Sequence, residues 1–167
     1  IAVKASSPIN SVKDLAGKQV VTTGNTTVVG TLKKYESVGF KTSYSKEHSE
    51  SFSMLDSGKM DAFVMDASIL ASNISQSKNP SDFKIVGEVL SVEPIACMLR
   101  KDDPMFKAAV DDSIKAQIAD GSLAKLYDKW FMQPIPPKNT KIGLPLSTST
   151  KAAWKKPNDN PVEAYAK

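Results

Sequence analysis

The chain has 167 residues, of which 41% are apolar and 24% charged, and its net charge is +4. This length suffices for one domain, or for one lobe with part of another, and the composition is that of a globular protein. No run approaches the roughly 20 apolar residues that a membrane-spanning helix needs, and residues 1–10 lack the apolar core of a secretory signal. Because the lysines are scattered, without interleaved aromatic residues, we expect no nucleic-acid binding.

The chain contains a single cysteine, Cys97, and a single histidine, His48. Since a structural zinc ion takes four ligands, we expect no metal site, and no motif indicates a cofactor. Nothing beside either residue indicates a nucleophilic Cys–His pair. Cys97 lies in the apolar run 94–100, which predicts a buried, unreactive thiol.

The first half of the chain alternates between strand-like and helix-like segments. Residues 1–10 are predicted to be a loop, and Ser11 or Asp14 can cap a short helical turn that Gly17 ends. The β-branched run 19–23 predicts a buried strand. The further segments expected here are a helix at 28–38, a strand at 40–45, a helix at 49–57, a strand at 61–66, a helix at 67–78 and a strand at 82–90. This alternation predicts parallel strand–helix–strand units and hence an α/β fold.

The second half has a different character. A strand is predicted at 94–100, and Asp103 and Pro104 are suited to the cap and the first position of a helix at 104–120. Gly121 should end that helix, and Ser122 can cap another. Four apolar residues predict a buried stripe along the first of these helices: Phe106, Val110, Ile114 and Ile118. The polar, proline-containing stretch 139–167 predicts an extended, partly ordered tail.

The most informative segment is the turn at 23–27, which links a predicted strand to a predicted helix. Its backbone N–H groups and the hydroxyls of Thr23, Thr26 and Thr27 can hold an anion, and the residue before Asn25 is a glycine that lets a ligand approach. The lysine of a nucleotide-binding loop is missing, so a carboxylate fits better than a phosphate. The alternative is that Asn25 or Thr26 only caps the helix.

Asp66 ends another predicted strand. Ligand-binding groups of open α/β sheets gather at the carboxyl ends of the strands, so Asp66 could hold an ammonium group near the threonine turn. The alternative, which is compatible with this role, is an N-cap for the helix at 67–78. The two strand ends together match the constant part of an α-amino acid. His48, in a polar turn, is either a solvated or capping residue or a donor to a polar ligand side chain.

No enzyme is indicated. The neighbouring acids at 102–103 and at 111–112 project in different directions on a helix, which makes them poor acid–base pairs. No nucleophile motif or dinucleotide-binding motif occurs in a strand–helix context. We therefore expect ligand binding without catalysis.

Beyond these local patterns, the sequence resembles the periplasmic amino-acid-binding proteins of ABC importers, and within them the branch that binds glutamate and aspartate. The segments that carry the resemblance are 23–27, 47–72, 95–114 and 126–139. The resemblance implies that Thr23, Asn25, Thr26 and Thr27 meet the α-carboxylate. It also implies that Asp66 accepts from the α-ammonium and that His48 contacts an acidic side chain. Asn25 stands where such proteins usually have threonine, which bears on ligand preference.

The resemblance also implies an organisation in lobes, in a type II periplasmic-binding-protein fold with a mixed, mostly parallel sheet flanked by helices. Residues 1–92 would form lobe 2, 93–138 the C-terminal part of an incomplete lobe 1, and 139–167 the tail. The rest of lobe 1, with an arginine for the α-carboxylate, is expected upstream of Ile1. We therefore expect weak ligand binding and a dimer through the unpartnered lobe 1 segment.

The function that follows is that of a receptor in the periplasm of a Gram-negative bacterium. It would bind glutamate or aspartate between the lobes and deliver it to the membrane subunits of an ABC importer, without a cofactor. Two alternatives use the same scaffold: a periplasmic enzyme similar to cyclic diacid dehydratases, and a ligand-sensing domain of a larger receptor.

Overall fold

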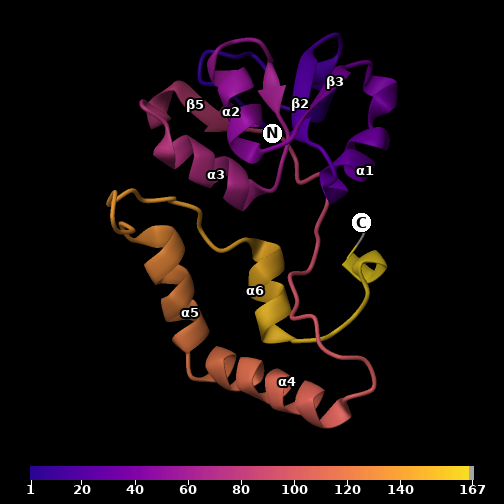
Figure 1. Cartoon of the computed structure of the whole chain (residues 1–167), viewed down its shortest axis with the longest axis vertical. Coiled ribbons are helices and arrows are strands. Elements are labelled where there is room, and N and C mark those ends of the chain that lie inside the picture. Colours follow the sequence, from indigo (N-terminus) through magenta and orange to yellow (C-terminus); the bar gives the residue numbers. More distant parts are fainter. Residues whose placement is uncertain (166–167) are drawn as a thin grey trace. The chain divides into compact units, whose positions relative to one another are not determined.

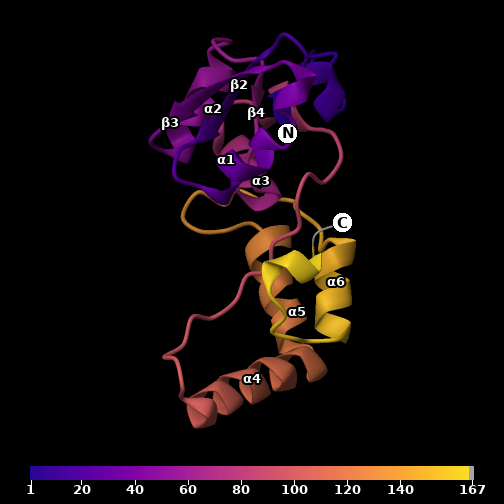
Figure 2. The same cartoon turned by 90° about the vertical axis from the view of Figure 1, so that its right-hand side faces the viewer.

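The computed structural model describes residues 1–165, which form two compact units. The first comprises Ile1–Leu90 with Ile142–Leu144, and the second comprises Ser91–Lys141 with the chain from Pro145 onward. The strands and helices α1 to α3 belong to the first unit, and helices α4 to α6 belong to the second (Figures 1 and 2). Ala166 and Lys167, the last residues of the predicted tail, lie outside the described residues.

The first unit is built on a five-stranded sheet with the strand order β3-β2-β4-β1-β5. Its strands are β1 (Ala2–Lys4), β2 (Gln19–Thr23), β3 (Lys41–Ser45), β4 (Ala62–Phe63) and β5 (Phe83–Ile85). Strand β2 pairs in parallel with both β3 and β4, whereas β1 is antiparallel to β4 and to β5. Four strands therefore share one direction, which confirms the predicted mixed, mostly parallel sheet.

Strand β1 corrects the prediction of a loop at the start of the chain. Ala2 pairs with Phe63 on one side and with Ile85 on the other, and Val3 pairs with Lys84. Ala2 and Val3 are completely buried. A strand of three residues carries too little periodicity to be recognised, and its partners lie far along the chain.

Three helices pack with this sheet: α1 (Thr27–Lys33), α2 (His48–Asp56) and α3 (Ala67–Gln76). The unit also contains three short 3-10 turns: η1 (Val12–Leu15) before β2, η2 (Glu36–Val38) before β3 and η3 (Pro80–Asp82) before β5. Helix α2 packs on β2, β3, β4 and α3, and Phe52 lies against Phe83 with the ring centroids 4.8 Å apart. The core that results consists of buried aliphatic and aromatic side chains, the largest being Phe63, Ile9, Leu15, Leu55 and Leu70.

Turn η1 forms as predicted from Ser11 and Asp14. The Asp14 carboxylate accepts hydrogen bonds from the N–H of Asn10 and the N–H of Ser11, each at 2.9 Å, and from the Ser11 hydroxyl at 3.1 Å. These bonds, with that from Asn10 first, hold the pKa of the Asp14 carboxyl below its usual value. Gly17 follows at a φ of 73°, a left-handed conformation that glycine adopts without strain.

The second unit contains α4 (Pro104–Ala119), α5 (Ser122–Tyr127), η4 (Asp128–Met132), α6 (Thr148–Lys155) and η5 (Val162–Tyr165). The predicted start of α4 is confirmed, because the Asp103 carboxylate accepts from the N–H of Phe106 at 3.1 Å and Pro104 is the first helical residue. Gly121 ends the helix with a φ of 77° and is itself the N-cap of α5, so the predicted cap at Ser122 was one residue late.

The predicted strand at 94–100 is absent from the described part of the chain, where these residues have no regular structure. A strand needs a neighbour to bond its backbone, and none of the described strands lies beside this run. Ile95 and Met98 are fully exposed, and so is the thiol-bearing Cys97, contrary to the buried thiol predicted. The expected burial of the α4 stripe is also wrong, since Phe106 keeps 54% of its surface exposed.

Helix α6 corrects the prediction that residues 139–167 are extended. The Ser147 hydroxyl accepts from the N–H of Thr150 at 3.0 Å and caps the helix, and the ring of Trp154 meets Tyr127 edge-on at 6.3 Å. The cap and the aromatic contact stabilise a segment whose composition alone indicates an irregular tail.

Strand β2 contains a buried polar atom with consequences for stability. Thr22 is completely buried, and its hydroxyl has no hydrogen-bond partner among the described residues. Replacing it with valine keeps the shape of the side chain and removes an unsatisfied polar group.

We expect Thr22→Val to raise the free energy of unfolding by about 1 kcal/mol in urea denaturation. Thr42→Val on the neighbouring strand β3 is the matched control, because Thr42 is partly exposed and should change stability by a few tenths of that amount. A Thr22→Val chain less stable than the wild type would mean that the hydroxyl has a partner.

Candidate functional site

The candidate site lies at the carboxyl edge of the sheet, where β2 and β4 end side by side. The two strands are parallel, with Val20 opposite Ala62 and Val21 opposite Phe63, and the N–H of Val64 continues the ladder to the carbonyl of Val21 at 3.0 Å. Adjacent strands of a sheet lie about 4.8 Å apart. The turn after β2 and the residues after β4 therefore meet at one edge, as predicted from the sequence.

The turn that follows β2 is fixed by short hydrogen bonds. The Thr26 hydroxyl donates to the carbonyl of Thr23 at 2.8 Å, and the N–H of Gly24 donates to the carbonyl of Ser45 on β3 at 2.9 Å. Thr26 is the N-cap residue of α1, but its hydroxyl bonds backwards to the strand and does not cap the helix. Asn25 and Thr27 are exposed, so the turn presents its backbone and the Thr27 hydroxyl to solvent.

Asn25 adopts a φ of 58°, in the left-handed region that asparagine tolerates and β-branched residues avoid. This conformation reverses the chain between β2 and α1. A side chain at the preceding Gly24 would approach the Ser45 carbonyl oxygen to 3.4 Å. A Cβ at Gly24 would thus make only an ordinary contact, and the left-handed Asn25 is the residue whose conformation shapes the turn.

His48 is the first residue of α2 and is joined to β2. Its Nδ1 lies 2.7 Å from the Thr23 hydroxyl oxygen, which is 3.4 Å from the Ser51 hydroxyl oxygen. The Ser51 oxygen lies 2.5 Å from that of Ser45 on β3. Sequence reasoning missed Ser45 and Ser51; the available signal was the spacing of three between His48 and Ser51, which places both on one face of a helix.

Asp66 lies at the N-cap position of α3, but its side chain makes no capping hydrogen bond to the helix, so only the position of the predicted alternative role is met. Its carbonyl accepts from the N–H of Leu70 at 3.0 Å, and it follows the buried residues Val64 and Met65. The residue itself is exposed. A carboxylate is therefore presented at the same edge as the threonine turn.

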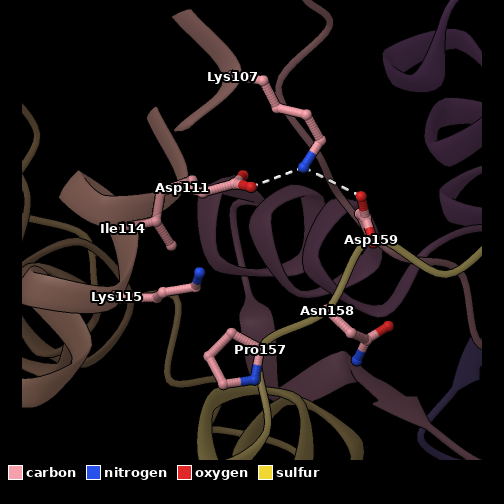
Figure 3. A pocket seen from close by; sticks show the side chains of 7 residues that line it. All are labelled: Lys107, Asp111, Ile114, Lys115, Pro157, Asn158 and Asp159. Atoms are coloured by element: carbon pink, nitrogen blue, oxygen red, sulfur yellow. Dashed lines mark hydrogen bonds and ion pairs between the residues drawn. The ribbon is translucent and has the colours of Figure 1, made fainter. Parts of the chain in front are cut away.

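A pocket in the second unit has a different chemistry (Figure 3). The Lys107 ammonium lies between the carboxylates of Asp111 at 2.6 Å and Asp159 at 3.0 Å. These contacts, the one with Asp111 first, raise the pKa of Lys107, and the ammonium lowers the pKa of Asp159. The residues that line this pocket include none of those predicted for ligand binding.

Metal binding and membrane insertion have no structural counterpart in residues 1–165. No group of three or more histidine, cysteine, aspartate or glutamate side chains is arranged there to hold a metal ion. None of the helices described is both long and apolar enough to cross a bilayer.

The comparison with known proteins decides the family. The profile of the bacterial extracellular solute-binding proteins, family 3, matches residues 6–133. The chain belongs to this family. It is 40% identical over 162 residues to the glutamate/aspartate import solute-binding protein of Salmonella typhimurium, covering 95% of this chain and 54% of that protein. It is also 40% identical over 163 residues to the L-glutamate/L-aspartate-binding protein of Pseudomonas aeruginosa, with 96% and 54% covered.

Solved structures of amino-acid-binding proteins show the same fold. An ancestral arginine-binding protein bound to glutamine matches with a TM-score of 0.66 and 33% identity over 78% of this chain and 57% of that chain. A probable amino-acid ABC transporter extracellular-binding protein from Bacillus subtilis matches with a TM-score of 0.68 and 27% identity, covering 77% and 57%. The predicted type II periplasmic-binding-protein fold is thereby confirmed. The chain spans about half the length of the curated relatives it matches.

The conformation of Asn25 generates a prediction about the turn of this family 3 chain. Asn25→Val should lower the free energy of unfolding by about 1–2 kcal/mol, because a β-branched residue is strained at positive φ. Asn25→Gly is the control and should be close to neutral, since glycine adopts this conformation freely. Chemical denaturation of both variants measures the difference, and equal losses would show that the asparagine side chain, not the backbone, stabilises the turn.

Proposed function

We propose that this chain is the greater part of a solute-binding receptor for an ABC importer and that its ligand is an acidic or polar amino acid, glutamate or aspartate first. The observation that carries the proposal is the shared sheet edge, where the exposed polar turn after β2 and the exposed Asp66 after β4 follow two paired parallel strands. These groups are complementary to the two charges of a zwitterion. The family and the curated relatives support the same conclusion.

We propose a role for each predicted residue. The α-carboxylate would bind the backbone N–H groups at Asn25 and Thr26 and the hydroxyl of Thr27. Thr26 contributes through its backbone, because its hydroxyl hydrogen already bonds the carbonyl of Thr23. Asp66 would accept from the α-ammonium. His48 would meet the side chain of the ligand from the first turn of α2, with its ring anchored on Thr23.

The proposal favours binding over catalysis. A dehydratase on this scaffold would need a general acid besides the groups that hold the ligand, and Asp66 is already assigned to the ammonium. A ligand-sensing domain would use the same groups, but the curated relatives with the highest identities named above carry the names of import and binding proteins. We therefore propose a transport receptor without enzymatic activity.

Location and partners follow from this role. The family is described as extracellular and bacterial, and the relatives include proteins of Salmonella typhimurium and Pseudomonas aeruginosa. We propose that the chain acts in the periplasm of a Gram-negative bacterium and delivers its ligand to the membrane subunits of the importer. Release would require a conformation with lower affinity for the ligand.

The 167-residue chain should bind L-glutamate weakly, with a dissociation constant of about 1–10 mM, equivalent to a binding free energy of about 3–4 kcal/mol. The reason is that the curated relatives are about twice as long, so their additional residues can contribute contacts to the ligand that this chain lacks. Chemical-shift perturbation in ¹⁵N-labelled protein measures this affinity.

Asp66→Asn should weaken binding about tenfold through loss of a charged hydrogen bond. Glu36→Gln, at the start of η2 and before β3, is the charge-matched control. Micromolar affinity would contradict the expected weakness, and no response to any amino acid would overturn the function.

Self-association is a second part of the proposal on partners. Apolar side chains exposed in the second unit favour association with a second copy: Ile95, Met98, Met105, Phe106 and Trp130. We propose a dimer through this face. Light scattering at high concentration should then give a mass near twice 18.0 kDa. Met105→Glu should favour the monomer, whereas Lys101→Glu should not, and a wild-type monomer at every concentration would refute the dimer.

A further inference from the structure

Behind the exposed edge of the site runs a chain of polar groups that ends at His48. The Ser45 hydroxyl donates to the carbonyl of Glu47 at 2.8 Å and lies 2.5 Å from the Ser51 hydroxyl. Ser51 contacts Thr23 at 3.4 Å, and Thr23 contacts the His48 Nδ1 at 2.7 Å. The three hydroxyl-bearing residues are buried, with 0–6% of their surface exposed, so they exchange hydrogen bonds with one another and not with bulk water.

The direction of each hydrogen bond among these polar groups follows from the first one, which Ser45 donates to the carbonyl of Glu47. A carbonyl only accepts, so the Ser45 hydrogen points to Glu47, and Ser45 must accept the hydrogen of Ser51. A hydroxyl has one hydrogen, so Ser51 in turn accepts the hydrogen of Thr23. With that hydrogen used, Thr23 accepts from the ring, and His48 Nδ1 is the donor.

We propose that Ser45, Ser51 and Thr23 form a relay that fixes the hydrogen of the neutral His48 ring on Nδ1. Nε2 is then an acceptor in the neutral ring and becomes a donor only when the ring takes up a second proton. Ser45 and Ser51 are thus positioning residues, since they act on the ligand through His48.

The relay has a consequence for ligand selection, which rests on the proposed function. A protonated ring donates from Nε2 to a side-chain carboxylate, whereas a neutral ring offers Nε2 as an acceptor, which suits the N–H₂ of a carboxamide. Imidazole changes charge between about pH 5 and pH 8. Lower pH therefore favours glutamate over glutamine, and higher pH favours glutamine.

The opposite arrangement has a definite cost. If Thr23 donated to His48 Nδ1, no hydrogen would lie between the oxygens of Thr23 and Ser51, which face each other at 3.4 Å in a buried position. The neutral ring would then carry its hydrogen on Nε2. The contact between Thr23 and Ser51 is the longest link of the relay, so it is the link to test.

Two of the charged groups on α2 are engaged away from the ring. On and before α2, the Glu50 carboxylate accepts the N–H of Lys46 at 3.0 Å, and Asp56 pairs with Lys4 of β1 at 2.7 Å. Strands β2 and β4 and helix α3 contain no charged residue. The other titratable groups on or beside the elements that pack against α2 include Lys18 before β2, Lys41 and Tyr44 on β3, Lys46 and Glu47 before α2, Lys59 and Asp61 before β4, and Asp66 before α3.

Nitrogen-15 NMR of the full chain tests the relay directly, because His48 is the only histidine and gives a single pair of ring signals. In the neutral ring, we expect the N–H signature on Nδ1 and the signature of an unprotonated nitrogen on Nε2. Ser51→Ala frees the Thr23 hydrogen to bond Nδ1 and should move the ring hydrogen to Nε2.

Two further variants complete this test. Ser45→Ala should have the same effect as Ser51→Ala, because Ser51 can then donate to Thr23, and it covers the case in which Ser51→Ala does not fold. Ser53→Ala is the control, since Ser53 lies on the same helix and bonds only the carbonyl of Ser49, at 2.8 Å. A wild-type ring with its hydrogen on Nε2, or one that neither relay variant alters, overturns the proposal.

Ligand titrations at about pH 5.5 and about pH 8.5 test the consequence. The ratio of glutamine affinity to glutamate affinity should rise about tenfold over this range in the wild type, and the rise should shrink in Ser51→Ala. A ratio that does not change with pH overturns the inference on selection. If neither amino acid binds while the Nδ1 hydrogen is observed, the proposed function fails and the relay stands.

Discussion

The parallel pairing of β2 with β4 is the constraint on which the candidate site depends. With Val21 opposite Phe63, the threonine turn and Asp66 reach the same edge of the sheet, although about forty residues of sequence separate them. A slip of the register by one residue would turn the Thr23 side chain away from His48, because successive side chains of a strand point to opposite faces. The buried side chains on both strands hold this register, so the core and the site are fixed by one set of contacts.

The side chains behind the exposed edge of the site are polar and buried, an arrangement uncommon enough to need an explanation. Thr23, Ser45 and Ser51 lie where apolar residues would pack equally well, and their hydroxyls satisfy one another and the His48 ring. Thr22, next along β2, shows the cost of a buried hydroxyl without such a partner. The proposed relay gives the connected hydroxyls a role in orienting the imidazole, which apolar side chains could not provide.

The second unit contains a strand-like sequence that is in no described sheet and a helix whose apolar stripe stays partly exposed. The sequence of 94–100 favours a strand, yet it adopts no regular structure, and the stripe of α4 stays partly exposed. The helix itself still forms, because its backbone bonds are internal and Asp103 caps it. A strand cannot do this, since its hydrogen bonds must come from another strand. Helix α4 forms and residues 94–100 do not form a strand because only the helix finds its backbone hydrogen-bond partners within its own segment.

The sequence by itself determined the alternation of strands and helices, the cap at Asp103, and the placement of Thr23, Asn25, Thr26, Thr27, His48 and Asp66 at the ends of elements. These features depend on local periodicity and turn chemistry, which a few neighbouring residues specify. Only the tertiary structure decided the insertion of β1, the helix α6, the exposure of Cys97 and the hydroxyl relay to His48. Each of these depends on partners far along the chain, and no local pattern encodes which distant groups will meet.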